Sequence, residues 1–244
     1  MSTELTPLAP GAARSARDVV AGLRLGAGGR PGRPRVVAAM IASLDGRAAV
    51  EGRSVRLGHP ADRQLLRELR TAADAVLVGT RTLAAERYAN LLDDDQRELR
   101  RADGRPEHPV IATVSRKLEL PLDVPLFAED VPVQVYTEAD GLAPTRGADV
   151  RTARLQPLTL PGVLEHLGRE RGARTVLCEG GPHLLRELVA QDGLDDLLLT
   201  VAPLLAAGDA PRVLEGPALP DPARLALHEV HRAGDHLVLH LRRP

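Results

Sequence analysis

Short, continuous runs of apolar residues, separated by amphipathic helical segments, constrain the fold of this chain more than any other feature of its sequence. The runs are too short for most helices, and their scarcity of charged residues is typical of strands buried on both faces. Such strands form parallel sheets covered by helices, so the sequence predicts an α/β protein. The expected strands span residues 36–42, 75–79, 109–115, 132–137, 175–179 and 197–205.

The connecting segments and the end of the chain complete the predicted architecture. Residues 60–73, 159–167 and 182–189 each repeat apolar residues at helical spacing, which is typical of helices that cover a sheet. Residues 225–232 and 235–242 are two further strands, close enough for an antiparallel hairpin. The expected fold is therefore a mixed, mostly parallel sheet with helices on both faces and a C-terminal antiparallel hairpin.

The N-terminal segment differs in composition from the rest of the chain. Residues 1–34 are rich in Ala, Gly, Pro and Arg, and we expect a loosely ordered arm with one short helix over 16–25. The glycine-rich stretch 26–29 follows no strand and precedes no Gly-Lys-Ser/Thr, so we interpret it as a linker rather than a phosphate-binding loop. Residues 35–244 are expected to form one domain, in which 91–108 is a charged loop.

The composition argues against several classes of protein. The one cysteine, Cys178, cannot build a disulfide framework or a cysteine-cluster zinc site, and its place in an expected strand predicts a core residue. A formal net charge of −1 argues against a nucleic-acid partner. The longest uncharged apolar stretch, 197–208, has about 12 residues, too few to span a bilayer. Because no signal-like apolar segment lies near the N-terminus, we expect a cytoplasmic protein without a membrane partner.

Four histidines near the C-terminus look at first like a metal cluster. On strands, His228 and His231 would point to opposite faces of the sheet. His236 and His240 would share a face but lie roughly 13 Å apart, at about 3.3 Å per residue. We therefore expect no metal site.

The clearest candidate site is the motif Glu179-Gly180-Gly181-Pro182-His183, where an expected strand meets an expected helix. Glycines let a ligand approach the backbone closely, and the start of a helix offers unpaired N–H groups that suit a phosphate. A tight turn between a strand and a helix would also favour glycine, so the residues alone leave both interpretations open. The spacing differs from the Gly-x-Gly-x-x-Gly of a Rossmann fold.

Two weaker candidates also follow expected strands. Ser115 and Arg116, with Lys117 after them, could hold an extra phosphate such as the 2′-phosphate of NADP, although a solvated turn is the simpler explanation. Asp45 follows the first strand, where a carboxylate can orient or protonate a heterocycle. The pair Asp45-Gly46 is also common in turns, and on sequence alone the turn is favoured.

Several further segments occur together with these motifs in a characteristic order. They are 42–46, 52–54, 69–79, 82–86, 111–115, 179–182 and 195–203. Together they resemble the reductase domain of the bifunctional deaminase/reductases of riboflavin biosynthesis, a branch of the dihydrofolate reductase-like fold. The deaminase half needs a His-x-Glu and a Pro-Cys-x-x-Cys motif, which one cysteine cannot supply, so the resemblance implies a stand-alone reductase.

The resemblance implies the NADPH-dependent reduction of 5-amino-6-(5-phosphoribosylamino)uracil to its ribitylamino product, with hydride transfer to C1′ of the opened ribose. It also implies a homodimer. Arg70 would bind the phosphate of this heterocyclic substrate, because its planar fork suits oxyanions. Asp45 would be the catalytic group, and Ser54 and Glu179 would also face the substrate. The residues along the cofactor would be Ala42, Gly79, Thr82, Glu86, Ser115, Arg116, Gly180, Gly181, Pro182, His183 and Leu184.

One segment departs from the pattern of that family. Where the family usually continues with an acidic residue and Asp-Pro-x-Leu, this chain reads Arg-Tyr-Ala-Asn-Leu at 87–91. Two alternatives therefore stay open: a reductase of the same fold that acts on a pterin- or dihydrofolate-like substrate, and a non-catalytic NADP-binding protein. The polar set Asp45, Arg70 and Glu179 argues against the second, since a mere binder needs no polar groups beyond the cofactor.

Overall fold

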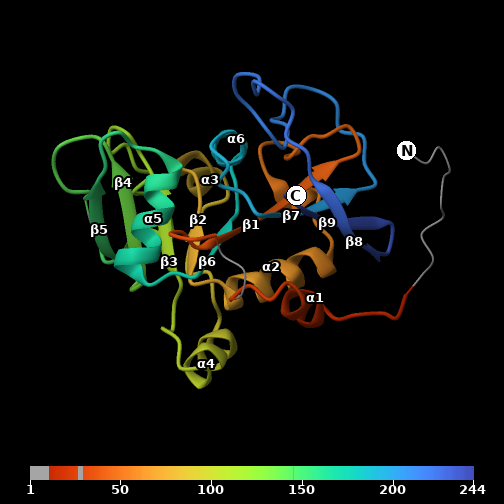
Figure 1. The fold of residues 1–244 in the computed structure, drawn as a ribbon, viewed down its shortest axis with the longest axis horizontal. Helices are drawn as coiled ribbons and strands as arrows, with labels where there is room; N and C mark the ends of the chain where they lie inside the picture. The colour runs from red at the N-terminus through yellow and green to blue at the C-terminus, as the bar shows by residue number, and fades with distance from the viewer. Residues whose placement is uncertain (1–10, 27–29, 145) are drawn as a thin grey trace.

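A mixed sheet organises the described part of the chain, which comprises residues 11–26, 30–144 and 146–244 of the computed structural model (Figure 1). The strand order is β5-β4-β3-β2-β6-β1-β7-β9-β8. Neighbouring strands are parallel, except that β9 is antiparallel to β7 and β8, so the predicted mixed sheet and C-terminal hairpin are confirmed. The strands are β1 (Arg35–Ser43), β2 (Ala75–Leu77), β3 (Val110–Val114), β4 (Pro132–Thr137), β5 (Asp149–Arg154), β6 (Thr175–Cys178), β7 (Asp196–Ala202), β8 (Ala226–Ala233) and β9 (His236–Arg242).

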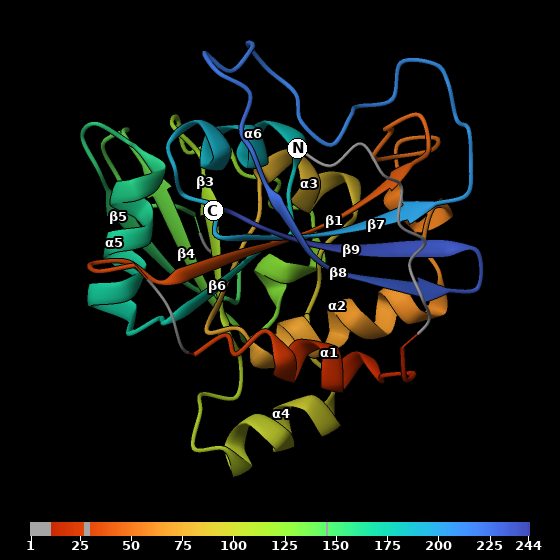
Figure 2. The ribbon, with the colours of Figure 1, turned by 45° about the vertical axis from the view of Figure 1, so that its right-hand side comes forward.

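Helices cover both faces of the sheet, as the sequence predicts. Figures 1 and 2 show α1 (Ala16–Gly22) and α2 (Pro60–Ala72) side by side on one face. The helices α5 (Leu160–Arg171) and α6 (Pro182–Ala190) pack on the other face. The expected helices over 60–73, 159–167 and 182–189 are thus present. Two short 3₁₀ turns, Ser54–Arg56 and Pro125–Ala128, lie in the connections.

The sheet separates two apolar cores. Because side chains alternate along a strand, each buried strand supplies both cores. In β1, Val37 faces the core that contains α1 and α2, while Val36 and Ala38 face the core that contains α5 and α6. Cys178 lies fully buried in the second core, where burial raises the pKa of its thiol to about 12. The prediction that Cys178 is a core residue is confirmed.

The predicted short N-terminal helix is present as α1, and it is packed rather than loose. Val19 and Val20 are buried against the core beside α2, and a capping box at Ser15 and Asp18 begins the helix. The prediction of a loosely ordered arm is therefore wrong for this stretch. The first ten positions of the expected arm and positions 27–29 of the expected linker lie outside the described residues.

The prediction of a charged loop over 91–108 is wrong, because α4 (Asp94–Ala102) occupies its centre. Asp93 accepts from the N–H of Gln96 while the Gln96 side chain accepts from the N–H of Asp93, which forms a capping box. The buried face of α4 carries Gln96 and Arg100 instead of apolar residues. Both side chains donate to backbone oxygens at the end of α2, including those of Arg67 and Ala73. Because the buried face of α4 is polar, its sequence does not repeat apolar residues at helical spacing, and the helix could not be predicted from that pattern.

Three smaller differences separate the structure from the prediction: two elements were not expected, and one strand is shorter than expected. The edge strand β5 and the helix α3 (Thr80–Ala85) are absent from the sequence-based prediction. β5 is half-exposed and carries Asp149, Arg151 and Arg154, so it lacks an apolar run. β7 ends at Ala202 rather than at Leu205, which is exposed.

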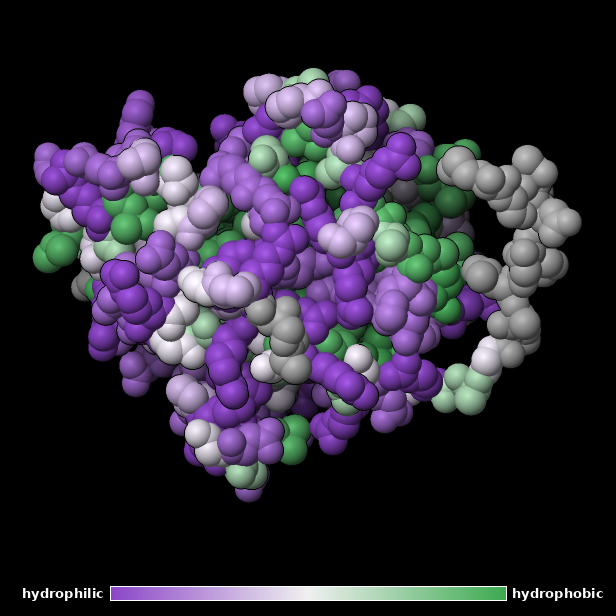
Figure 3. All heavy atoms as spheres, in the orientation of Figure 1, coloured by the Kyte–Doolittle hydropathy of each residue, from purple (hydrophilic) through white to green (hydrophobic). Residues whose placement is uncertain are grey.

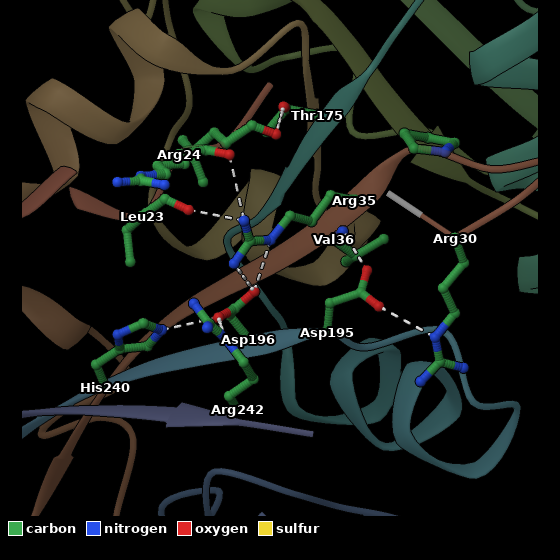
Figure 4. Close-up of polar contacts among 12 residues, drawn as sticks. Leu23, Arg24, Arg30, Arg35, Val36, Thr175, Asp195, Asp196, His240 and Arg242 are labelled. Atoms are coloured by element: carbon green, nitrogen blue, oxygen red, sulfur yellow. Dashed lines mark hydrogen bonds and ion pairs between the residues drawn. The ribbon is translucent and has the colours of Figure 1, made fainter. Parts of the chain in front are cut away.

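A buried charge network ties α1 to the first residues of β1 and β7 (Figure 4). This edge of the sheet lies opposite the edge that carries the turn at Gly180 and Gly181, called the diglycine turn below. The guanidinium of Arg35 donates to Asp196 at 2.8 Å and to the carbonyl of Leu23 at 2.7 Å. His240 lies 2.8 Å from Asp196, and Arg242 donates to the same carboxylate at 2.9 Å. Three of the four histidines considered as metal ligands thus have other partners: His240 contacts Asp196, His236 contacts the carbonyl of Leu57, and His231 contacts Glu229.

The visible surface is largely hydrophilic (Figure 3). Hydrophobic atoms gather on the side where Figure 1 places the β8–β9 hairpin, and Leu227 and Leu237 of that hairpin are exposed. Among the described residues, none of the helices has both the length and the apolar character needed to cross a bilayer.

Candidate active site

Two hollows adjoin at the diglycine turn. The first hollow has a volume of about 560 Å³ and lies between α2, α3 and the carboxyl ends of β1 and β6. The second hollow, about 460 Å³, lies between α3, α6 and the start of α5. Both are lined by Arg81, Thr82, Gly181, Pro182 and His183. One elongated ligand could therefore pass from one hollow to the other along this shared wall.

The parallel strands β2 and β6 bring the walls of these hollows together. They are neighbours in the sheet, so the residues after them meet at one edge, where Figures 1 and 2 show α3 and α6 side by side. The N–H of Gly79, after β2, donates to the carbonyl of Gly180, after β6, at 3.0 Å. Three glycines expected along a cofactor, Gly79, Gly180 and Gly181, are thus in contact.

The Thr82 side chain occupies the position next to Gly181 that a Cβ atom would need. A Cβ atom there would lie 2.7 Å from Oγ1 of Thr82, and Gly180 has a φ of +91°, which favours glycine. The peptide bond between the two glycines is cis. The first N–H groups of α6, at His183 and Leu184, have no partner within the helix, and no side chain caps this helix in the described structure. The turn therefore offers free backbone donors and the positive end of a helix dipole to an anion.

Of the two cofactor candidates that follow β3, Ser115 and Arg116, one lines the second hollow. Arg116 lines it and forms an ion pair with Glu138 at 2.9 Å. Ser115 is buried outside the lining, and its hydroxyl donates to the carbonyl of Glu119 at 3.0 Å. Arg116 can thus face a ligand in this hollow, whereas the structure gives the Ser115 hydroxyl a partner in its own turn.

A buried polar cluster closes one end of the first hollow. Arg70 donates two hydrogen bonds to the Glu179 carboxylate, at 2.7 and 2.6 Å, and the Tyr88 hydroxyl donates to Glu179 at 2.6 Å. The Arg70 guanidinium also lies 5.8 Å from the centre of the Tyr88 ring. Burial, followed by the charge of Glu179, raises the pKa of Tyr88 well above its ordinary value, so the phenol keeps its proton.

The hydroxyl of Tyr88 is expected to contribute measurably to stability. Tyr88→Phe removes a hydrogen bond to a buried carboxylate and should lower the free energy of unfolding by about 1.5–3 kcal/mol. The measurement is urea unfolding followed by circular dichroism. Tyr136→Phe is the matched control, because its hydroxyl contacts the uncharged ring of His166 at 3.1 Å and should cost about 1 kcal/mol. Equal losses in both variants would contradict a charged acceptor at Tyr88.

Comparison with known proteins identifies the family. The sequence matches the family described as the RibD C-terminal domain over residues 34–239, well over half of the chain. The chain belongs to the RibD C-terminal domain family.

Two sequence relatives and one solved structure are similar to this chain. A 2,5-diamino-6-ribosylamino-4(3H)-pyrimidinone 5′-phosphate reductase of Archaeoglobus fulgidus is 27% identical over 213 residues, 83% of this chain and 95% of that protein. The riboflavin biosynthesis protein RibD of Mycobacterium tuberculosis is 30% identical over 182 residues, 73% of this chain and 45% of that protein. The structure of a pyrimidine reductase-like protein from Corynebacterium diphtheriae has a TM-score of 0.77 at 24% identity, covering 94% of this chain and 98% of that one. The structural match shows that the two proteins share the fold described above.

Within this RibD C-terminal domain, most of the candidate residues lie in the two hollows. Glu86 and Ser54 both line the first hollow, where the Glu86 carboxylate accepts from the N–H of Ser54 at 2.8 Å. Glu86 therefore holds the 52–54 segment against α3. The other candidates that line a hollow are Gly79, Thr82, Arg70, Arg116, Glu179, Gly181, Pro182, His183 and Leu184.

Three further candidates, Asp45, Ala42 and Gly180, lie outside the lining of both hollows. The Asp45 carboxylate accepts from the Ser43 hydroxyl at 2.6 Å and from the N–H groups of Ala206 and Ala207 at 2.9 and 2.8 Å. These bonds hold the pKa of Asp45 well below its ordinary value. The structure thus agrees with the turn that the Asp-Gly pair suggested, and an ionised carboxylate engaged in a turn does not supply a proton to a ligand. We do not retain Asp45 as the catalytic group.

Sequence reasoning missed three polar residues of the first hollow. Arg63 and Arg81 line it, and in the described structure neither has a carboxylate partner, unlike Arg70 and Arg87. Asp62 lines it as well and accepts from the Thr200 hydroxyl at 2.6 Å. An acidic residue such as Asp62 is common in the first turn of a helix, where it interacts favourably with the helix dipole, so its position gave no signal. The described residues contain no group of three or more His, Cys, Asp and Glu residues placed to hold a metal ion.

Proposed function

We propose that this chain is an NADPH-dependent reductase of a ribosylamino-pyrimidine 5′-phosphate in riboflavin biosynthesis. The observation that carries the proposal is the pair of hollows that adjoin at the diglycine turn, which lets an elongated cofactor in the second hollow reach a substrate in the first. Membership of the RibD C-terminal domain family and the names of the relatives support the reaction class. The substrate is 5-amino-6-(5-phosphoribosylamino)uracil or its 2-amino counterpart, the compound that names the archaeal relatives.

The residues of the turn fit a dinucleotide. A pyrophosphate would bind to the N–H groups of His183 and Leu184, at the start of α6 beside Gly181. Arg116, in the second hollow, is placed for a further phosphate on the adenosine side, which is why we propose NADPH rather than NADH. Thr82 and Arg81 line both hollows and would lie between the two ends of the cofactor.

The first hollow would hold the substrate. When bound, the nicotinamide supplies a hydride to C1′ of the opened ribose, while the neighbouring nitrogen gains a proton. The Arg70–Glu179–Tyr88 cluster presents a fixed polar wall to the heterocycle. Because Glu179 already accepts from Arg70 and Tyr88, Arg70 acts through this cluster rather than as the main phosphate ligand. Arg63 and Arg81 line this hollow and have no carboxylate partner in the described structure, so we assign the substrate phosphate to them.

The test is turnover by the purified protein, followed as loss of the nicotinamide absorbance. The two ribosylamino-pyrimidine phosphates and dihydrofolate are offered in parallel. We expect turnover with at least one of the two pyrimidines. Turnover with dihydrofolate alone would contradict the pyrimidine substrate but not the cofactor. Failure to bind NADPH would contradict the proposed function as a whole.

Loss of Arg63 is expected to weaken substrate binding selectively. Arg63→Ala should raise KM for the phosphorylated pyrimidine roughly tenfold or more, about 1.4 kcal/mol, because a charge-assisted contact to phosphate is lost. NADPH affinity, measured by titration of nicotinamide fluorescence, should stay within about twofold of the unaltered protein's. Arg169→Ala, an exposed cation on α5, is the control and should leave both values unchanged. Equal loss of substrate and NADPH affinity would contradict this assignment.

A further inference from the structure

The first hollow holds one acidic side chain whose role is unexplained. Asp62 is half-buried in the first turn of α2 and accepts a hydrogen bond from the Thr200 hydroxyl of β7 at 2.6 Å. Both residues line the hollow, together with apolar side chains that include Met40, Leu65 and Leu198. Asp62 has no ion pair within 4.0 Å in the described structure, although Arg63 follows it in the chain.

The other acids of this hollow are already engaged. Glu179 accepts from Arg70 and Tyr88, so it is held as a carboxylate. Glu86 accepts from the N–H of Ser54 at 2.8 Å, and Glu215 accepts from the N–H of Arg212 at 2.8 Å. Of the carboxyl groups described there, Asp62 alone is bonded only to a hydroxyl, which can act as donor or acceptor and so tolerates a protonated carboxyl.

We propose that Asp62, oriented by Thr200, donates the proton that the substrate nitrogen gains during reduction. This inference rests on the proposed function. As hydride adds to C1′, the electron pair of the C1′–N double bond moves to nitrogen, where a new N–H bond forms. The O–H bond of Asp62 breaks, and its carboxylate then regains a proton from water. The proposal replaces Asp45, which lies outside the hollow.

The surroundings of Asp62 favour a carboxyl that keeps its proton to higher pH than an exposed aspartate. Burial raises its pKa, and the opposing effects of Thr200, His236, Arg63 and His59 are smaller. The two histidines are held by the backbone: His59 Nδ1 accepts from the N–H of Ala61, and His236 Nε2 contacts the carbonyl of Leu57. Their ring centroids lie 5.0 Å apart, so the two rings also pack against each other beside Asp62.

The decisive experiment is the pH dependence of kcat in Asp62→Asn. The asparagine keeps the contact with Thr200 but carries no transferable proton. In the unaltered enzyme kcat should fall about tenfold per pH unit above the pKa of Asp62, and the variant should be roughly a hundredfold slower with that slope absent. NADPH affinity and KM should change little. Asp95→Asn, an exposed acid on α4, is the control and should keep the full profile.

A second readout needs neither cofactor nor substrate. Carbon-13 NMR of the Asp62 carboxyl in the free protein should give a titration midpoint above 3.8, the ordinary value for aspartate. Thr200→Val removes a bond that favours the carboxylate and should move this midpoint further up. A midpoint at the ordinary value, or a sloping kcat profile in Asp62→Asn, would overturn the role of Asp62 alone. If the unaltered protein turns over none of the offered substrates, the proposed function falls as well.

Discussion

Gly181→Asp is expected to abolish cofactor binding. A Cβ at this position would lie 2.7 Å from Oγ1 of Thr82, closer than real Cβ atoms come, so the turn or the Thr82 side chain must move. The carboxylate would also put a negative charge at the start of α6, where the proposed pyrophosphate binds. We expect a loss of NADPH affinity of roughly a hundredfold or more, which corresponds to about 2.8 kcal/mol.

The measurement is a fluorescence titration of NADPH with three variants. Gly181→Ala adds the Cβ without the charge and should give an intermediate loss, which separates the steric effect from the electrostatic one. Gly11→Asp is the matched control, because Gly11 is exposed and a Cβ there meets nothing within 4 Å. Circular dichroism shows whether each variant is folded. A folded Gly181→Asp protein with undiminished NADPH affinity would remove the turn from the cofactor site.

The strands were predictable because burial on both faces leaves a signature in the sequence. The runs that contain Val36–Ala38 and Val176–Cys178 are apolar because consecutive side chains enter two different cores. The helix α4 was not predictable on the same grounds. Its buried residues, Gln96 and Arg100, donate to backbone oxygens of α2 and of Ala73, which follows it. The sequence of α4 is therefore as polar as that of a solvent-exposed segment.

The site was predictable where it depends on the backbone and not where it depends on long-range contacts. The diglycine turn could be recognised in the sequence, because two glycines between a strand and a helix indicate a backbone conformation or a close approach that other residues do not allow. Asp45 and Asp62 are equally acidic in the sequence, and only the fold distinguishes them. Asp45 bonds to the loop at Ala206 and Ala207, and Asp62 meets Thr200; each partner is more than a hundred residues away along the chain.

Asp196→Ala is expected to be the most destabilising single substitution proposed for this chain. Asp196 is fully buried at the start of β7, where it accepts from Arg35 and Arg242 and contacts His240 (Figure 4). Removing it leaves the buried Arg35 guanidinium without its carboxylate, which should cost about 3–5 kcal/mol of the free energy of unfolding. This is a large fraction of the roughly 5–15 kcal/mol that stabilises an ordinary domain. Asp221→Ala, an exposed control, should change it by less than about 0.5 kcal/mol.

The same network makes stability depend on pH in a defined window. Burial would raise the pKa of Asp196, but the hydrogen bonds from His240, Arg242 and Arg35 outweigh it and lower the pKa to about 2 from the ordinary 3.8. Because the folded-state pKa is depressed, this contribution is complete above pH 3.8 and is lost as the pH falls toward 2. Urea unfolding of the unaltered protein should therefore lose roughly 2 kcal/mol more than Asp196→Asn across that interval. Parallel losses in the two proteins would mean that folding does not lower the pKa of Asp196, which would contradict a stabilising ion pair with Arg35.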